Sequence, residues 1–332
     1  MAAGRFTNDN SRVAPILIVQ LCALNERDNI GAVLAEIPRV IPGIERVEVL
    51  VVDDGSTDDT AAVARAAGAD HILSMGANKG LARAFQAGID AALAAGAGIV
   101  VNIDADGQYR GADIPALIAP ILQGRADVVI GDRQTQTLNH FSPIKRLLQK
   151  IGSAVVQSAA GVAVPDAVSG FRAYERDAAL RLFVSTRFSY TVQSVIQAGK
   201  LGLRIAHVPI IARETRRPSR LHKGIAHFVT QQALILLRTY ATYEPLRTFL
   251  LFAMPFLVVG TGLLARAAWL AGQRGGQFGN VQSIIVGTVF LLIGLLSAAT
   301  GIIADRITEN RRLLDEVLYR LRKQAADAGK PR

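Results

Sequence analysis

Two aspartates at the end of an apolar segment are the residues of this sequence best suited to hold a metal ion. The segment IVVNIDADGQ (99–108) predicts a buried strand that ends in Asp104, with Asp106 and Gln108 on the turn that follows. Carboxylates two residues apart on a tight turn can converge on one hard cation. Mg²⁺ and Mn²⁺ prefer such oxygen ligands and often bind substrate phosphates as well. A solvated surface turn could carry the same residues, but the position at a strand end favours a metal site.

A second acidic pair occupies a similar place earlier in the chain. In VLVVDDGSTDDT, Asp53 and Asp54 follow a buried strand and precede a Gly-Ser turn and a helix start. Carboxylates there can accept hydrogen bonds from a ribose or from a base N–H. Capping of the next helix, by a Ser, Thr or Asp side chain between 56 and 58, is the alternative role for this stretch.

Two basic segments could hold phosphate. Lys79 and Arg83 in GANKGLARAFQAG (76–88) lie around a predicted helix N-terminus, where the N–H groups and the helix dipole favour anions. The segment TRRPSRLHKG (215–224) contains Arg216, Arg217, Arg220 and Lys223, and it could hold a lipid phosphate or diphosphate. Nonspecific attraction to anionic lipid would explain the second segment equally well.

Residues 1–212 alternate between short apolar runs and Ala-rich helical segments. Strands are predicted at 15–24, 47–56, 71–74, 98–106 and 126–133, and helices at 29–41, 57–69, 80–96 and 113–124. This alternation is typical of an α/β domain, with a mostly parallel sheet covered by helices on both faces. Ligands bind at the carboxyl ends of the strands in such sheets, and both acidic pairs lie there.

The C-terminal part of the chain has a different composition. Residues 249–265 and 275–304 carry no charge, and each run can supply the ~20 apolar residues that a transmembrane helix needs. Two buried helices of a soluble core are the alternative. The net charge of +10 comes entirely from residues 213–332, which hold 17 Lys and Arg against 7 Asp and Glu. Because this charge flanks the apolar runs, it favours a membrane surface over nucleic acid, and the positive-inside rule places both ends in the cytoplasm.

These patterns divide the chain into four parts. We expect a cytoplasmic catalytic domain at 1–222, a juxtamembrane interfacial helix at 223–248, two transmembrane helices at about 249–271 and 281–304, and a basic amphipathic tail at 305–332. The segment 143–160 has a similar helical stripe, which suits either a headgroup layer or an ordinary core. The Gly260-x-Gly262-x-x-Ala265 spacing mimics a dinucleotide fingerprint, but it lies inside an apolar run with no preceding strand, so we reject that reading.

Several motifs in order now support a family resemblance. ALNERDNI, VVDDGSTDDT, NKGLARAFQAGI, NIDADGQ, GDR, SGFRAY, FSYT and RPSRL resemble the family 2 glycosyltransferases of the GT-A fold. The two apolar helices narrow the resemblance to the polyprenyl-phosphate glycosyltransferases, such as dolichol-phosphate mannosyltransferase and the bacterial undecaprenyl-phosphate transferases. The resemblance implies a GT-A domain with a C-terminal two-helix transmembrane hairpin.

The resemblance also implies roles for particular residues. The nucleotide sugar would be bound by residues from four motifs: Ala23, Asn25, Glu26, Asp53, Asp54, Lys79, Arg83, Asp104, Ala105 and Asp106. Mg²⁺ or Mn²⁺ would sit on Asp104, Asp106 and Gln108. The acceptor phosphate would meet Arg133, Arg146, Ser169, Arg217, Arg220 and Lys223. The sequence departs from the family pattern at Cys22, Asp132 and Gln193, where proline, a small residue and glutamate are usual.

The expected activity is transfer of a sugar from a UDP- or GDP-linked donor to a polyprenyl phosphate, with inversion at the anomeric carbon. A phosphate monoester has its second pKa near 6, so this acceptor is already an anionic nucleophile and needs no general base. The catalytic residues would be Asp104, Asp106 and Arg133. The product would be a lipid-linked monosaccharide at the cytoplasmic face of a bacterial inner membrane or an ER-type membrane.

Other functions fit the sequence less well. A processive polysaccharide synthase would carry a QxxRW motif, but the single tryptophan, Trp269, follows Ala267-Ala268. A non-catalytic nucleotide-sugar-binding subunit and a GT-A transferase with another acceptor stay open. We expect no nucleic-acid partner, and the helical hairpin would permit a homo-oligomer.

Overall fold

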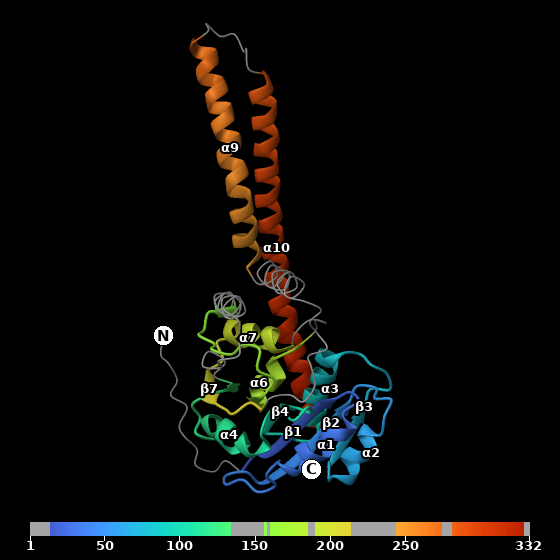
Figure 1. Ribbon diagram of the computed structural model, residues 1–332. Helices are drawn as coiled ribbons and strands as arrows, with labels where there is room; N and C mark the ends of the chain where they lie inside the picture. The colour runs from blue at the N-terminus through green and yellow to red at the C-terminus, as the bar shows by residue number, and fades with distance from the viewer. Residues whose placement is uncertain are drawn as a thin grey trace, which may run out of the picture. The chain divides into compact units, whose positions relative to one another are not determined.

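The computed structural model describes residues 14–133, 156–157, 160–184, 190–213, 244–273 and 281–328 (Figure 1). The chain forms two compact units. One comprises Met1–Gly224 together with Val317–Arg332, and the other comprises Ile225–Glu316. The end of the chain therefore belongs to the same unit as the predicted catalytic domain, which the sequence pattern did not indicate.

A seven-stranded sheet forms the centre of the first unit. Its strands are β1 (Ile16–Ala23), β2 (Arg46–Asp53), β3 (His71–Ser74), β4 (Ile99–Asp104), β5 (Val128–Asp132), β6 (Arg172–Glu175) and β7 (Ile205–Pro209). Their order is β3-β2-β1-β4-β6-β5-β7. All neighbours pair in parallel except β6, which runs antiparallel to both β4 and β5. The prediction of a mostly parallel sheet is confirmed, while β6 and β7 were not predicted.

Helices connect and cover these strands. They are α1 (Arg27–Ala35), α2 (Thr60–Ala66), α3 (Leu81–Ala94), α4 (Ile114–Leu122), α6 (Arg176–Arg181) and α7 (Tyr190–Lys200), with a short 3₁₀ turn η1 (Gly111–Asp113). On one face of the sheet, alternate residues of β1 pack in one core with Ile30 of α1 and Leu117 of α4. On the other face, α3 approaches so closely that a Cβ on Gly88 would meet Val52 of β2 at 2.9 Å. Helices therefore cover both faces, as the alternating pattern predicts.

Two helix boundaries differ from the predictions. The first helix was predicted to run to residue 41, but α1 already ends at Ala35, shortly before Pro38. The residue before a proline is biased away from helical backbone, which explains the early end. The second helix was predicted to begin at residue 57, but α2 begins at Thr60. Its N-cap residue, Asp59, makes no side-chain capping bond. Asp58 instead accepts hydrogen bonds from the main-chain N–H and the hydroxyl of Thr60.

Two long helices provide the apolar segments. The helix α9 (Pro245–Gln273) lies in the second unit, and α10 (Val281–Ala328) begins there and continues into the first unit. An apolar stretch within each helix has a mean hydropathy of 2.1 in α9 and 2.2 in α10, so both helices are long and apolar enough to cross a membrane. Only 11% and 17% of these stretches are buried. Within the second unit, Gly260 lets α9 approach α10 closely, because a Cβ there would lie 2.8 Å from the main-chain nitrogen of Leu291. Small residues at such crossings are typical of membrane helix pairs.

Candidate active site

The two aspartates of the predicted metal site lie where β4 ends. Asp104 is the last residue of β4 and is half-buried, while Asp106 lies exposed on the turn that follows. The turn is closed by a hydrogen bond of 2.9 Å from the main-chain N–H of Gln108 to the Asp106 carboxylate. Gly107 takes a φ of 77°, which is a left-handed conformation that favours glycine. The spacing of the motif therefore places two carboxylates on one tight turn at the carboxyl edge of the sheet.

The environment of Asp104 leaves its negative charge poorly compensated. Burial and repulsion from Asp106 raise the pKa of Asp104 to about 6, although the charge of Arg133 opposes this rise. The hydroxyl of Tyr190 donates to the Asp104 carboxylate at 3.4 Å and accepts a hydrogen bond of 3.1 Å from the Asn102 amide. A cation bound between Asp104 and Asp106 would stabilise the ionised form of both carboxylates.

The donor set fits a hard divalent cation. Carboxylate oxygens from Asp104 and Asp106 and an amide oxygen from Gln108 are ligands that Mg²⁺ and Mn²⁺ accept. Among the residues that the structure describes, no cluster of three or more His, Cys, Asp or Glu side chains could hold a metal. Mg²⁺ commonly uses one or two carboxylates and completes its shell with water and substrate phosphates, so two carboxylates at this edge suffice.

The ends of β1 and β2 are joined through side chains predicted to bind the nucleotide. The Asn25 side-chain oxygen accepts a hydrogen bond of 2.8 Å from the main-chain N–H of Thr57. The main-chain N–H of Asn25 donates to the Ser56 hydroxyl at 3.0 Å, and Asp53 accepts from the N–H of Ser56 at 2.9 Å. Asn25 has a φ of 55°, which asparagine tolerates better than most residues. The two loops therefore form one connected rim beside the end of β4.

Other predicted nucleotide ligands lie along the same rim. Ala23 is buried at the end of β1, and Ala105 is buried between the two aspartates of the turn. Glu26 receives a hydrogen bond of 2.7 Å from the Asn29 amide, which fixes its carboxylate beside the first turn of α1. Since β1 lies between β2 and β4, these residues share the carboxyl edge with Asp53 and Asp104.

Asp54 has a structural task that the sequence did not reveal. Its two carboxylate oxygens accept hydrogen bonds from the main-chain N–H groups of Lys79, at 2.8 Å, and Gly80, at 2.9 Å. These bonds hold the loop before α3 against the end of β2. The close packing requires Gly55, which has a φ of 79° and whose Cβ would lie 2.4 Å from the main chain of residue 77. The side chains of Lys79 and Arg83 are exposed at this end of α3.

Arg133, predicted to meet the acceptor phosphate, is paired with a carboxylate. Its guanidinium donates to both oxygens of Asp166, at 2.7 Å and 2.9 Å. Burial would raise the pKa of Asp166, but the hydrogen bonds and the charge of Arg133 outweigh burial and hold this pKa below its usual value. The Asp166 side chain is 1% exposed and the Arg133 side chain 18% exposed, so the arginine is mostly buried but still reaches solvent, and its charge acts on Asp104.

A glycine and a buried arginine shape the floor of the site. Gly170 lies against Asp104, and Ser169 beside it is fully buried. Arg172 is also fully buried and donates to the carbonyl oxygens of Ser169, Ala167 and Thr191 at 2.7 to 2.8 Å. This guanidinium fixes the loop that carries Ser169 and Gly170 to the start of α7.

Part of the predicted site lies outside the described residues. This holds for the expected acceptor ligands Arg146, Arg217, Arg220 and Lys223 and for most of the two interfacial segments, 143–160 and 224–243. Within the described chain, sequence reasoning missed Asp166, Tyr190 and Asn102. Two of them lie in motifs singled out in the sequence, because Asp166 opens the DAVSGFRAY segment and Tyr190 belongs to the FSYT motif.

The Gln193 departure from the family pattern has a structural explanation. Gln193 is buried in α7, and its amide donates a hydrogen bond of 3.3 Å to the carbonyl oxygen of Phe183. An ionised glutamate could not donate this bond. Cys22 lies on β1 directly opposite Asp104 of β4, and burial followed by the charge of Asp104 raises the pKa of its thiol, so the sulfur stays neutral there.

The chain is similar to several known proteins. Residues 18–183 match the family described as Glycosyl transferase family 2. Polyprenol monophosphomannose synthase of Mycolicibacterium smegmatis is 29% identical over 208 residues, which cover 59% of this chain and 77% of the relative. Dolichyl-phosphate hexose transferase of Haloferax volcanii is 32% identical over 206 residues, covering 62% and 86%. Undecaprenyl-phosphate mannosyltransferase of Micrococcus luteus is 29% identical over 196 residues, covering 56% and 79%.

Solved structures share the fold. Glucosyl-3-phosphoglycerate synthase from Mycobacterium tuberculosis, crystallised with Mn²⁺, UDP-glucose and phosphoglyceric acid, aligns with a TM-score of 0.52 and 27% identity. The alignment covers 67% of this chain and 79% of the synthase. The family match begins within β1, includes β2 to β6 and contains every strand end that carries a predicted donor-site residue. The chain therefore belongs to glycosyl transferase family 2 and is a glycosyltransferase with a GT-A fold.

Proposed function

We propose that this glycosyltransferase moves a sugar from a nucleoside-diphosphate sugar to a polyprenyl phosphate, by a single displacement with inversion at the anomeric carbon. The observation that carries the proposal is the carboxylate pair Asp104 and Asp106 at the end of β4, next to the rim formed by Asn25 and Asp53. Three relatives are named for transfer to polyprenol, undecaprenyl phosphate or dolichyl phosphate, which supports a polyprenyl phosphate acceptor. The solved neighbour with bound UDP-glucose supports a nucleotide-sugar donor.

The donor diphosphate belongs beside the aspartate turn. Asp104, Asp106 and Gln108 would hold Mg²⁺ or Mn²⁺, which when bound supplies positive charge against the leaving diphosphate. The rim at Asn25, Glu26 and Asp53 offers carboxylate and amide oxygens for the ribose and base. Lys79 and Arg83, exposed at the start of α3, add positive charge at a helix N-terminus, where anions are favoured.

The acceptor needs orientation rather than deprotonation. A polyprenyl phosphate is anionic at neutral pH, so its oxygen can attack without a general base. The obstacle is repulsion between two anions, which a fixed cation reduces. Arg133 is such a cation, because Asp166 holds its guanidinium in a bidentate pair while part of the arginine side chain stays exposed. Arg146, Arg217, Arg220 and Lys223 are proposed to assist from segments outside the described residues.

A polyprenyl acceptor requires access to a membrane. The helices α9 and α10 meet the length and hydropathy that a membrane span requires. Basic residues before and after these helices favour an orientation with both flanks in the cytoplasm, so the reaction would take place at the cytoplasmic face.

The first test is a transfer assay on the full chain in detergent. The protein receives undecaprenyl phosphate, Mg²⁺ or Mn²⁺ and a panel of UDP- and GDP-sugars, with and without EDTA. We expect one lipid-linked sugar product that disappears with EDTA. Free nucleotide without a lipid product would refute the polyprenyl acceptor, and product formation that EDTA does not affect would refute metal dependence.

A carboxylate-to-amide change tests the aspartate turn. Asp104→Asn should lower kcat by more than about 100-fold, because replacing an outer-shell partner of a metal site already costs ~10 to 100-fold. The melting temperature should change little, since the amide keeps the shape of the side chain. Glu45→Gln is the matched control, because Glu45 is exposed at the opposite, amino end of β2 and its change removes the same charge. Retained activity in Asp104→Asn would refute the assignment of Asp104 as a metal ligand.

A further inference from the structure

The last turns of α10 are fastened to the catalytic unit through several side chains. The hydroxyl of Tyr319 donates a hydrogen bond of 2.6 Å to Asp177 of α6, and the guanidinium of Arg181 lies 4.1 Å over the Tyr319 ring. Arg176 contacts Asp327 at 3.4 Å. Ala326 is buried. These contacts all lie within one compact unit, so this end of the helix is part of the catalytic domain's own packing.

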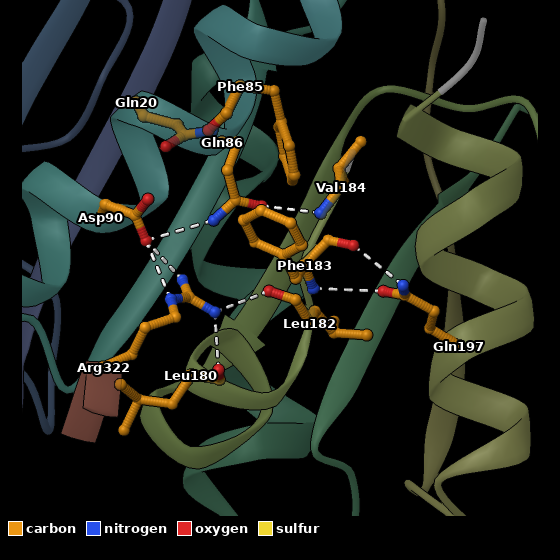
Figure 2. A network of polar contacts seen from close by, with 10 residues as sticks. All are labelled: Gln20, Phe85, Gln86, Asp90, Leu180, Leu182, Phe183, Val184, Gln197 and Arg322. Carbon is orange, nitrogen blue, oxygen red and sulfur yellow. Dashed lines mark hydrogen bonds and ion pairs between the residues drawn. The ribbon is translucent and has the colours of Figure 1, made fainter. Parts of the chain in front are cut away.

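Arg322 makes the most extensive of these contacts (Figure 2). Its Nε and Nη2 donate to one carboxylate oxygen of Asp90 on α3, at 3.0 Å and 2.5 Å. Its Nη1 donates to the carbonyl oxygens of Leu180 and Leu182, at 2.6 Å and 2.8 Å. These carbonyls lie at the end of α6, where main-chain acceptors lack helical partners and attract a cation. The Arg322 side chain is 11% exposed and the Asp90 side chain 49% exposed, so the bonds to the two carbonyl oxygens are better shielded from water than the ion pair.

The contacts of Arg322 continue into α3. The same Asp90 oxygen accepts a hydrogen bond of 3.1 Å from the Gln86 amide, one helical turn earlier. The other end of that amide accepts a bond of 2.8 Å from the main-chain N–H of Val184. Figure 2 shows Asp90 between Arg322 and Gln86, with Gln86 facing Val184. The segment 180–184 is thus held twice on this side, by Arg322 and by Gln86.

On its other side the same segment is bound to α7. The Gln197 side chain accepts from the N–H of Phe183 at 3.1 Å and donates to its carbonyl oxygen at 2.8 Å (Figure 2). Gln193 donates to the same carbonyl. A two-way amide bond of this kind engages both main-chain groups of Phe183, so the segment 180–184 is one of the supports of α7, together with Arg172 at Thr191.

The start of α7 reaches the catalytic turn. Tyr190 opens α7, and its ring stacks on Phe85 of α3 with centroids 4.4 Å apart. Its hydroxyl donates to the Asp104 carboxylate. The helix α3 therefore supports Tyr190 at Phe85 and is itself bound to Arg322 at Asp90, one and a half turns further along.

From these contacts we infer that Arg322 is a positioning residue for the active site, which acts on Asp104 through α3, the segment 180–184 and Tyr190. The bonds to Asp90, Leu180 and Leu182 join two elements that both bear on Tyr190. Loss of the guanidinium removes the donor that the carbonyl oxygens of Leu180 and Leu182 share and leaves Asp90 with the Gln86 amide. The segment 180–184 is then held less firmly, and α7 can shift away from Asp104. The inference rests on the proposed catalytic role of Asp104.

We call the chain of contacts from Arg322 through α3 and the segment 180–184 to Tyr190 the relay. The first experiment tests this relay without any substrate. Hydrogen–deuterium exchange with mass spectrometry compares the full-length protein in detergent with Arg322→Gln. We expect faster exchange in peptides covering 180–184 and the first turns of α7, and no change in β2 and β3, which lie at the far edge of the sheet. Faster exchange confined to 317–328 would overturn the relay and leave the helix end as a simple anchor.

The second experiment measures its effect on catalysis. With Arg322→Gln, kcat for sugar transfer should fall about 10-fold or more while KM for the donor changes less than about 2-fold, since misplacement of catalytic groups acts on the chemical step. Arg322→Lys should recover part of kcat, because one ammonium can reach Asp90 or the carbonyls but cannot match the fork of donors. Arg306→Gln, which removes an exposed positive charge from the same helix, is the matched control and should behave as wild type.

A substitution at Asp90 tests the same contacts from the side of α3. Asp90→Ala removes one arm of the relay and leaves the carbonyl bonds, so it should give the same direction with a smaller fall in kcat, even where Arg322→Gln folds poorly. Unchanged kcat in both variants would overturn the inference. If the wild-type protein forms no lipid-linked product, the proposed acceptor is wrong, whereas the exchange experiment still decides the relay because it needs no substrate.

Discussion

A substitution at Gly170 would displace Asp104, the proposed metal ligand, without removing its carboxylate. An ideal Cβ on Gly170 would lie 2.5 Å and 2.8 Å from the two carboxylate oxygens of Asp104 and 2.8 Å from the Tyr190 hydroxyl. Ordinary van der Waals contact begins at 3.4 Å, so Gly170→Ala forces a displacement of about 0.6 to 0.9 Å. The glycine has no positive φ, so the added methyl group changes the space near Asp104 and not the backbone preference.

The size of this displacement sets the expected effect. A shift of ~1 Å in a catalytic group can cost about 100-fold in rate, so kcat for sugar transfer should fall ~10 to 100-fold. Overpacking costs typically about 1 to 3 kcal/mol, and the melting temperature of the purified protein should therefore fall by roughly 2 to 12 °C. Steady-state kinetics at saturating Mn²⁺ separate kcat from KM, and titration of Mn²⁺ by electron paramagnetic resonance measures metal affinity without any donor.

Gly31→Ala is the matched control for this change. Gly31 lies in α1, and a Cβ there meets its neighbours only at ordinary contact distances of 3.8 Å or more. This variant should keep full activity and gain some helix stability, since alanine favours a helix over glycine by ~1 kcal/mol. If Gly170→Ala keeps both kcat and Mn²⁺ affinity while folding normally, the carboxylate of Asp104 does not need the position described above, and the site assignment is wrong.

Two further substitutions test the surroundings of the site. Gln193→Glu replaces the amide that donates to Phe183 with a buried carboxyl group, which should lower the free energy of unfolding by about 1 to 3 kcal/mol. The loss should grow as pH rises and the acid ionises, which melting curves at pH 5 and pH 8 would measure. Asp166→Asn should cost about 2 to 3 kcal/mol by leaving Arg133 without its carboxylate. Because Arg133 lowers the Asp166 pKa, this pair stabilises the fold above the unfolded pKa near 3.9 and loses its effect as pH falls below it, so the variant should weaken acid destabilisation below about pH 4 in denaturant titrations.

Much of the first half of the fold follows from local pattern. Alternation of apolar runs with Ala-rich helices predicted β1 to β5 and the helices between them, because each strand buried on both faces reads as a continuous apolar run. The same reasoning placed Asp53 and Asp104 together, since parallel strands bring their carboxyl ends to one edge. Their strands are separated by β1 alone, as the order β2-β1-β4 shows.

Contacts between distant segments were beyond that pattern. The role of Asp54 depends on main-chain N–H groups 25 and 26 residues away, and the sequence carries no local sign of such bonds. The attachment of Arg322 to Asp90 spans 232 residues. The basic amphipathic tail was predicted as a cytoplasmic helix, and its charge suggested a surface role. A single arginine among several gives no indication of which carboxylate it meets.

The antiparallel strand β6 explains why the acceptor side of the site was the hardest part to predict. The strand is inserted between β4 and β5, with Arg172 opposite Asn102 and Glu175 opposite Ile99. Because β6 runs against β4, its amino end lies where β4 ends, and the loop that precedes it reaches the turn from Asp104 to Asp106. A parallel strand would have brought its carboxyl end there instead. This reversal carries Asp166 to Arg133 and Gly170 to Asp104, so half of the site depends on a pairing direction that a run of only four residues, RAYE, does not specify.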